Sequence, residues 1–194
     1  MVTIGIMAVI LTVILMNQRN YTEVASLSNL ADSLSLTISQ AQAYGIAVKE
    51  VSPGSADFGT AYGITLSILS SGSNTSYLFF ADKNGNGYYD GSWSCPVDGA
   101  SECLERVDFS GGNYINELCR VRDNPNNPYQ CNNIGRIDIS FIRPIPEAQM
   151  MFFNQSGNLI DYDPEFIGAR ISVRSPGGIT RSVIVYYTGQ VSVQ

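Results

Sequence analysis

The chain begins with a run in which almost every position is apolar. Positions 1–16 read MVTIGIMAVILTVILM, without a single charge, and a polar segment follows at 17–20. In a helix this run covers about 24 Å, less than the roughly 30 Å hydrocarbon core of a bilayer. A cleaved signal peptide requires a basic segment before the run and a small-residue cleavage site after it, and the sequence has neither. A buried core helix is the alternative, but so long a run without a polar face is unusual in a small domain. We therefore expect positions 1–20 to form a hydrophobic helix that inserts into a membrane.

Past position 20 the apolar residues lie on one side of a continuing helical pattern. They recur at spacings of three and four residues, at Val24, Leu27, Ala31, Leu34, Ile38 and Ala41. No proline occurs before Pro53, and Gly45 is the first residue expected to end a helix. The pattern predicts one helix of about 45 residues. Its segment 21–50 is an amphipathic continuation that packs against its own domain.

The remainder, 51–194, has the pattern of short strands. Seven runs are rich in Ile, Val, Tyr and Phe, and Gly, Asn, Ser and Pro separate them. These runs are 61–69, 76–81, 104–109, 136–142, 149–154, 170–174 and 181–187. Alternation of polar and apolar residues over 136–141 predicts a half-buried antiparallel strand. We expect an α+β fold, in which the long helix packs on an antiparallel β-rich head.

Composition narrows the function classes. Charged residues make up 14% of the chain, the net charge is −6, and histidine is absent. An acidic surface repels phosphate backbones, which argues against nucleic acid as a partner. The commonest general base is missing, and no nucleophile elbow or phosphate loop occurs. The acidic residues Asp161, Asp163 and Glu165 lie in a proline-containing segment and are interpreted as a solvated turn. We expect no enzyme, although an anchored exported enzyme or binding protein that uses the head for a ligand is the alternative.

The most specific local motif lies at positions 82–90. Acidic and amide side chains occupy the first, third, fifth and ninth positions of a calcium loop, Gly87 occupies the sixth, and a backbone carbonyl falls at the seventh. These residues are Asp82, Asn84, Asn86, Tyr88 and Asp90. The twelfth position is Trp93, so the bidentate carboxylate is missing unless Asp98, Glu102 or the 161–165 cluster supplies it through the fold. The alternative is an Asn/Gly-rich turn whose side chains bond their own backbone.

Four cysteines lie close together in the middle of the chain, at Cys95, Cys103, Cys119 and Cys131. Their gaps do not contain the C-x-x-C pairs that zinc sites favour. If the head lies in an oxidising compartment, disulfides are the better interpretation. We favour Cys95–Cys103 and Cys119–Cys131 among the three connectivities, with four free thiols as the alternative. Either pair closes a short loop, so positions 91–133 are predicted to be a disulfide-stapled loop region.

The N-terminal run resembles the type IV pilin family. Family members begin with a pattern like F-T-L-I-E-L followed by V-x-I-x-I-x-x-I-L, and positions 1–11, MVTIGIMAVIL, are similar to the second part. The resemblance implies that Met1 is internal to the mature protein, and that about six residues, with the processing glycine and the motif glutamate, lie upstream of it. Restoring six residues lengthens the apolar segment to about 33 Å, enough to span.

The middle and the end of the chain resemble the GspH/FimT group of pseudopilins. The segment 77–90 is similar to that group's D-x-x-G-D-G-x-x-D element, and 183–193 is similar to its last two strands. Members implicated in DNA uptake carry arginines at this ending, whereas this chain has Gln190 and Ser192. DNA binding is therefore not expected.

The resemblance implies the type IV pilin fold and a structural role in an extracytoplasmic filament. The chain is expected to be a pilin or pseudopilin, held in the inner or cytoplasmic membrane before assembly and then placed in a cell-surface filament. Its partners are expected to be copies of itself or other pilin subunits, together with the inner-membrane assembly machinery. The residues expected in the filament core or membrane are Ile4, Ile6, Val9, Ile10, Leu11, Val13, Ile14 and Leu15.

Overall fold

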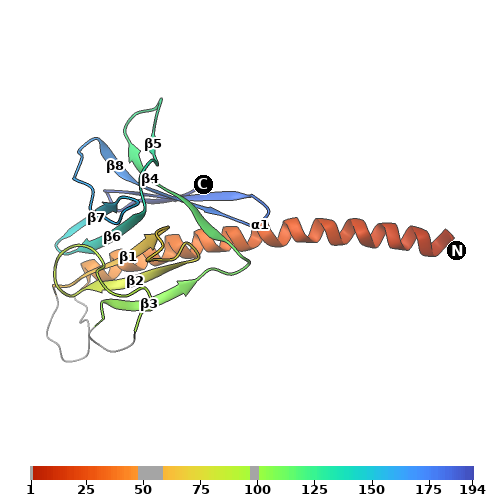
Figure 1. The fold of residues 1–194 in the computed structure, drawn as a ribbon, viewed down its shortest axis with the longest axis horizontal. Coiled ribbons are helices and arrows are strands. Elements are labelled where there is room, and N and C mark those ends of the chain that lie inside the picture. Colours follow the sequence, from red (N-terminus) through yellow and green to blue (C-terminus); the bar gives the residue numbers. More distant parts are fainter. Residues whose placement is uncertain (1, 48–58, 97–100) are drawn as a thin grey trace.

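The computed structural model describes residues 2–47, 59–96 and 101–194, and its description of side chains leaves out positions 2, 8–10 and 13–20. In these ranges a single helix precedes ten strands (Figure 1). The elements are α1 (Val2–Ile46), β1 (Ala61–Ser67), β2 (Ser76–Asp82), β3 (Cys103–Asp108), β4 (Tyr114–Arg122), β5 (Tyr129–Gln130), β6 (Arg136–Ile142), β7 (Ile145–Phe153), β8 (Phe166–Arg174), β9 (Thr180–Tyr186) and β10 (Val191–Val193).

The strands form two five-stranded antiparallel sheets. Sheet A has the order β3-β2-β1-β6-β7, and sheet B has the order β10-β9-β8-β4-β5. In sheet A, β1 is the central strand, with Ile64 opposite Phe79 of β2 and Ile139 of β6. In sheet B, β8 is central and pairs along its length with β4 and β9. The backbone N–H of Ala148 in β7 donates to the carbonyl of Tyr187 at the end of β9, which joins the sheets.

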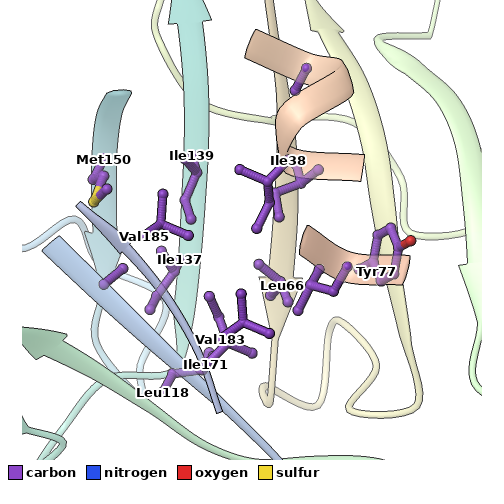
Figure 2. Close-up of a cluster of buried hydrophobic side chains, with 14 of the residues drawn as sticks. Ile38, Leu66, Tyr77, Leu118, Ile137, Ile139, Met150, Ile171, Val183 and Val185 are labelled. Atoms are coloured by element: carbon purple, nitrogen blue, oxygen red, sulfur yellow. The ribbon is translucent and has the colours of Figure 1, made fainter. Parts of the chain in front are cut away.

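One hydrophobic core unites the helix and both sheets. The C-terminal part of α1 contacts β1, β6 and β7 of sheet A and β8, β9 and β10 of sheet B. Figure 2 shows Ile38 of α1 facing Leu66 and Ile139 of sheet A, with Val183 of sheet B nearby. Leu27, Ala31, Leu34, Ile38 and Ala41 are fully buried, so five of the six predicted stripe residues lie in the core.

The end of α1 depends on a close backbone approach. The helix ends at Ile46, one residue past the predicted Gly45. A Cβ atom at Gly45 would lie 2.3 Å from the carbonyl oxygen of Phe141 in β6. Glycine is therefore required there because the helix passes directly against the backbone of sheet A.

The predicted fold class is wrong. The molecule is mostly β rather than α+β, because two full antiparallel sheets form where seven strands were expected. The strands that were not predicted include β4 and β5, which lie in a region predicted to be loop. The assignments of a membrane-spanning first half of the helix and of the type IV pilin fold are also withdrawn. Within the ranges that the structure describes, no helix is both long enough and apolar enough to cross a membrane.

Candidate functional site

The segment that follows β2 covers the face of sheet A that α1 does not reach. Residues on alternate positions of β2 divide between two clusters: Tyr77 and Phe79 belong to the main core, whereas Leu78 and Phe80 belong to a second one. Tyr89 completes this second cluster, with its ring centroid 5.6 Å from that of Phe80. Sheet A is therefore buried on both faces at β1 and β2, which carry only buried residues.

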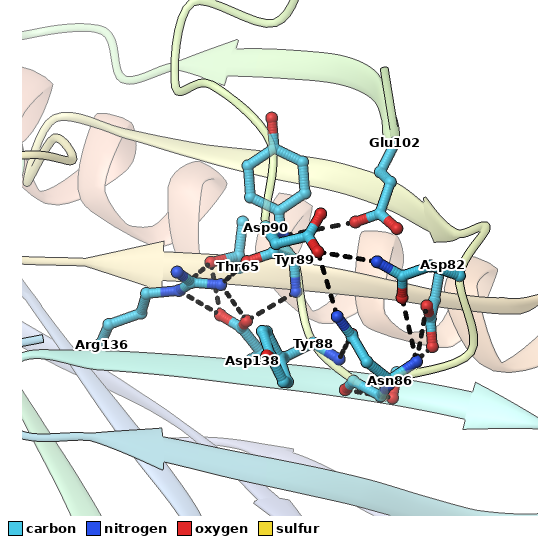
Figure 3. Close-up of polar contacts among 12 residues, drawn as sticks. Thr65, Asp82, Asn86, Tyr88, Tyr89, Asp90, Glu102, Arg136 and Asp138 are labelled. Carbon is cyan, nitrogen blue, oxygen red and sulfur yellow. Dashed lines mark hydrogen bonds and ion pairs between the residues drawn. The ribbon is translucent and has the colours of Figure 1, made fainter. Parts of the chain in front are cut away.

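The 82–90 loop, which contains the predicted calcium residues, is held by its own side chains (Figure 3). The carboxylate of Asp82 accepts hydrogen bonds from the backbone N–H groups of Gly85 (2.8 Å), Asn86 (3.2 Å) and Gly87 (2.7 Å). One oxygen of Asp90 accepts from the side-chain amides of Asn84 (2.7 Å) and Asn86 (3.1 Å). Gly85 and Gly87 have φ values of +76° and +84°, which only glycine adopts without strain. These contacts give a compact turn that draws its acidic and amide groups together.

Glu102 fastens both ends of this loop. Its two carboxylate oxygens accept from the backbone N–H of Lys83 (3.1 Å) and of Asp90 (3.3 Å), and the residue is 5% exposed. Burial raises the pKa of Glu102, and the nearby charges of Asp90 and Asp82 raise it further, against the two backbone hydrogen bonds. The loop therefore concentrates three carboxyl groups around one short stretch of chain.

Beneath the loop lies a buried ion pair between Arg136 and Asp138 of β6. Asp138 is fully buried, and its carboxylate accepts from Thr65 Oγ1 (2.5 Å), from the backbone N–H of Tyr89 (2.8 Å) and from the Arg136 guanidinium. Arg136 also donates to the carbonyl of Tyr89. Burial raises the pKa of Asp138, and its hydrogen bonds and the Arg136 charge oppose that rise. This pair anchors the loop to the sheet.

The burial of Asp138 overturns one prediction about β6. The alternating pattern predicted a strand with one face in solvent, yet Asp138 and Ser140 are both fully buried. Ser140 donates its hydroxyl to the carbonyl of Gly87 at 3.2 Å. The polar face of β6 is thus covered by the 82–90 loop and satisfied by it, rather than by water.

The predicted calcium ligands are brought together, but their oxygens already have partners. The side-chain oxygens of Asn84 and Asn86 each accept a hydrogen bond from the backbone N–H group two residues later in the chain. The carboxylate of Asp82 accepts from three backbone N–H groups of the loop. This is the turn alternative that the sequence left open, and calcium binding stays a prediction. Glu102 lies at the loop, as one of the carboxylates considered for the missing twelfth ligand, whereas Asp98 falls outside the described residues. Among the described residues, the potential ligand atoms of Glu117, Cys119 and Cys131 lie within 4.8 Å of one another. Both of those sulfurs are in a disulfide.

The predicted disulfides are confirmed as Cys95–Cys103 and Cys119–Cys131. The first closes the segment that covers sheet A, and the second ties β4 to the residue that follows β5. The region 91–133 is nevertheless not a loop, because β3, β4 and β5 lie within it. The cysteines therefore staple strands and their connections.

The predicted filament residues lie on the part of α1 that extends away from the strands, which we call the protruding segment (residues 3–21) (Figure 1). Ile4, Ile6 and Leu11 expose 72%, 55% and 58% of their surface. The side chains of the other five predicted residues, Val9, Ile10, Val13, Ile14 and Leu15, lie outside the description. Every described side chain of the protruding segment is exposed.

Searches against family models, curated proteins and solved structures return no match for this chain. The function must therefore be argued from its own residues. Sequence reasoning missed Arg136 and Asp138 because they lie in a strand pattern where charge is read as a solvent-facing position. It missed Arg120 because the region 91–133 was predicted to be loop. Charged residues inside strands whose neighbours are strongly apolar are the signal that was available.

Proposed function

We propose that this chain is a structural subunit of an extracytoplasmic filament, in the role that a pilin or pseudopilin has, and that it assembles through the protruding segment of α1. The observation that carries the proposal is the contrast along one helix. Leu27, Leu34 and Ile38 are fully buried in the head, whereas Ile4, Met7 and Leu11 are more than half exposed (72%, 68% and 58%).

The exposed apolar surface of the protruding segment requires a partner. Burying apolar surface is favourable by about 25 cal/mol per Å², and contiguous exposed apolar patches usually mark interaction sites. No charge interrupts positions 1–16, so charge pairing does not specify this contact. The occupant that we propose is the same segment of neighbouring copies, because like apolar surfaces pack together without charge complementarity.

A filament follows from the geometry of such a contact. A head-to-tail contact between identical subunits that does not close into a ring extends into a helical array. A rigid helix that extends from one end of the head presents its apolar surface to several neighbours at once. The heads then lie outside the helical core, where their acidic surface (net charge −6 for the chain) keeps them solvated.

The two disulfides support an extracytoplasmic location. Disulfides persist in oxidising compartments such as the periplasm and the cell exterior, and they are rare in the cytosol. All four cysteines are paired, with no free thiol among them. A cell-surface filament is therefore the location that we propose.

The test introduces a charge on the protruding segment of the full chain. Leu11→Glu and Ile6→Glu should abolish sedimentable filaments seen by electron microscopy, because an unpaired carboxylate in an apolar interface is costly. Ile145→Glu is the matched control: Ile145 is 48% exposed, and its turn lies at the opposite end of α1, where Gln42 Nε2 donates to the carbonyl of Pro146. The control should assemble normally. Circular dichroism should show the same head in all variants. Filaments that persist in both charged variants, or a wild-type chain that stays monomeric, would contradict the proposal.

A further inference from the structure

A hollow of about 750 Å³ lies on the head, away from the protruding segment. Its walls come from β7, from Arg120 of β4, from Phe166 of β8 and from residues 159–163 between β7 and β8. Apolar side chains dominate the walls, among them Met150, Phe152 and Ile160. A concave, largely apolar site with a few polar groups is the usual form of a small-molecule pocket.

Arg120 is the most deeply buried charge of this hollow. It is 6% exposed, and its guanidinium lies 4.8 Å from the ring centroid of Phe152 and 4.7 Å from that of Phe166. One of its five donors is used, by a hydrogen bond of 3.3 Å from Nη2 to the carbonyl of Asp161. Nε is buried without a partner, and no described carboxylate lies within salt-bridge distance of the group. Two aromatic faces compensate part of this burial, but they leave the buried Nε without a hydrogen-bond acceptor.

The charge around the hollow changes sign from the inside to the rim. Arg120 is buried, Asp163 is half-buried, and Asp161 and Glu147 are exposed. Arg120 and Asp163 line the same hollow. Burial lowers the pKa of Arg120, while the nearby Tyr187 and Asp163 act in the opposite direction. The rim carboxylates would repel a simple anion that approached Arg120, and Arg120 would repel a simple cation. A ligand that carries a positive and a negative charge close together complements both Arg120 and the rim.

We propose that this hollow binds a free α-amino acid with a large apolar side chain. The carboxylate pairs with the Arg120 guanidinium, whose Nε has no partner within the chain, and the ammonium group pairs with Asp163 at the rim. The side chain packs against the apolar wall around Met150 and Phe152. Carboxylates are the anions that a guanidinium binds with two parallel hydrogen bonds. The inference does not depend on filament assembly, because no described residue of α1 lines the hollow.

The chain offers a matched control for Arg120. Arg122 lies two positions along β4, its guanidinium is 4.9 Å from the centroid of the same Phe166 ring, and its Nε is also buried without a partner. It lines a different hollow, beside Asp123 and Glu165. Arg122→Gln therefore removes a similar charge and ring contact but leaves the proposed site intact.

The experiment is calorimetric titration of the full chain with L-phenylalanine, with 3-phenylpropionate, which lacks the ammonium group, and with 2-phenylethylamine, which lacks the carboxylate. L-phenylalanine should bind about tenfold or more tightly than either of the others. Arg120→Gln should weaken the binding of L-phenylalanine by about tenfold, and Arg122→Gln should weaken it by less than about twofold. Asp163→Asn should weaken the binding of L-phenylalanine but not that of 3-phenylpropionate.

Three results would overturn the proposal: no heat with L-phenylalanine at millimolar concentration, equal affinity for L-phenylalanine and 3-phenylpropionate, or equal losses in the two arginine variants. The wild-type ligand series decides the matter by itself if Arg120→Gln does not fold. In that case Asp163→Asn, at a half-buried rim position, is the test variant, and it must weaken the binding of L-phenylalanine without weakening that of 3-phenylpropionate.

Discussion

Two arginines in the strands of this protein are largely buried, and their surroundings are opposite. In sheet A, Arg136 is paired with a fully buried Asp138, and each makes further hydrogen bonds to the covering loop. In sheet B, Arg120 lies between two aromatic rings with one hydrogen bond and no described carboxylate partner. The difference separates structure from function: a buried charge whose partners all lie within the chain holds the fold together, whereas one left without partners is available to a ligand.

The largest expected effect comes from breaking the paired centre. Asp138→Ala leaves Arg136 buried without a counter-charge and leaves Thr65 and the N–H of Tyr89 without an acceptor. The free energy of unfolding should fall by about 3–5 kcal/mol in urea titrations. Asp108→Ala is the control, because Asp108 pairs with Arg106 on the surface, with 66% of its side chain exposed. It should cost less than about 1 kcal/mol. Equal losses in the two variants would show that the buried pair has no special structural role.

Each region also has its own disulfide, which permits a second comparison. Removing Cys95–Cys103 or Cys119–Cys131 by paired Cys→Ser changes should lower the free energy of unfolding by about 2–3 kcal/mol in either case, because the closed loops are of similar length. Denaturant titration of the two double variants measures this directly. A loss confined to one variant would mean that the two staples differ in more than loop closure.

Neutralising the unpaired arginine should have a much smaller effect on stability. Arg120→Gln removes one hydrogen bond and two ring contacts, but it also removes the cost of a buried, unpaired charge. We expect the free energy of unfolding to change by no more than about 1 kcal/mol. Arg136→Gln should lower it by about 3–5 kcal/mol, because it leaves Asp138 buried without a counter-charge. Thermal and urea unfolding of both variants provide the measurement. If Arg120→Gln proved as damaging as Arg136→Gln, Arg120 would be a structural residue and not a ligand group.

The covering loop of sheet A should respond to pH through Glu102. Folding raises the pKa of Glu102, so the folded state favours its protonated form. The contribution of Glu102 to the free energy of unfolding is therefore fully present below its ordinary pKa of 4.5 and is lost as pH rises through the folded-state pKa. Relative to the wild type, Glu102→Gln should therefore gain stability as pH increases from about 4.5 towards neutrality. Unfolding curves of both proteins across this range give the difference. A difference that is constant with pH would rule out a raised pKa.

The smallest effect expected is that of calcium on the same loop. If Asp82, Asn84, Asn86 and Asp90 hold calcium weakly, the ion stabilises the head by about 0.4 kcal/mol at a concentration equal to its dissociation constant. Millimolar calcium should raise the melting temperature slightly, and Asp90→Asn should remove the rise. Magnesium at the same concentration is the control for ionic strength. An identical response to both ions would leave the loop as a plain turn.

Much of the local structure could be predicted from the sequence. The spacing of Leu27, Ala31, Leu34, Ile38 and Ala41 predicted the buried stripe of α1, and all five are fully buried. The cysteine spacing favoured the disulfides that form, and the 82–90 motif was assigned to a turn or an ion loop. These features depend on residues within a few positions of one another, so that periodicity, loop length and turn chemistry are sufficient to find them.

The sequence by itself thus determined where the chain is helical, where it turns and which side of α1 is apolar. Only the tertiary structure decided that the strands form two sheets and that a loop covers the second face of sheet A. It also decided that Asp138 is fully buried with its partner whereas Arg120 is buried without one. Alternation along a strand shows that two faces differ, but what covers each face is set by segments distant in the chain. Asp138 and Tyr89, for example, are 49 positions apart and joined by one hydrogen bond of 2.8 Å.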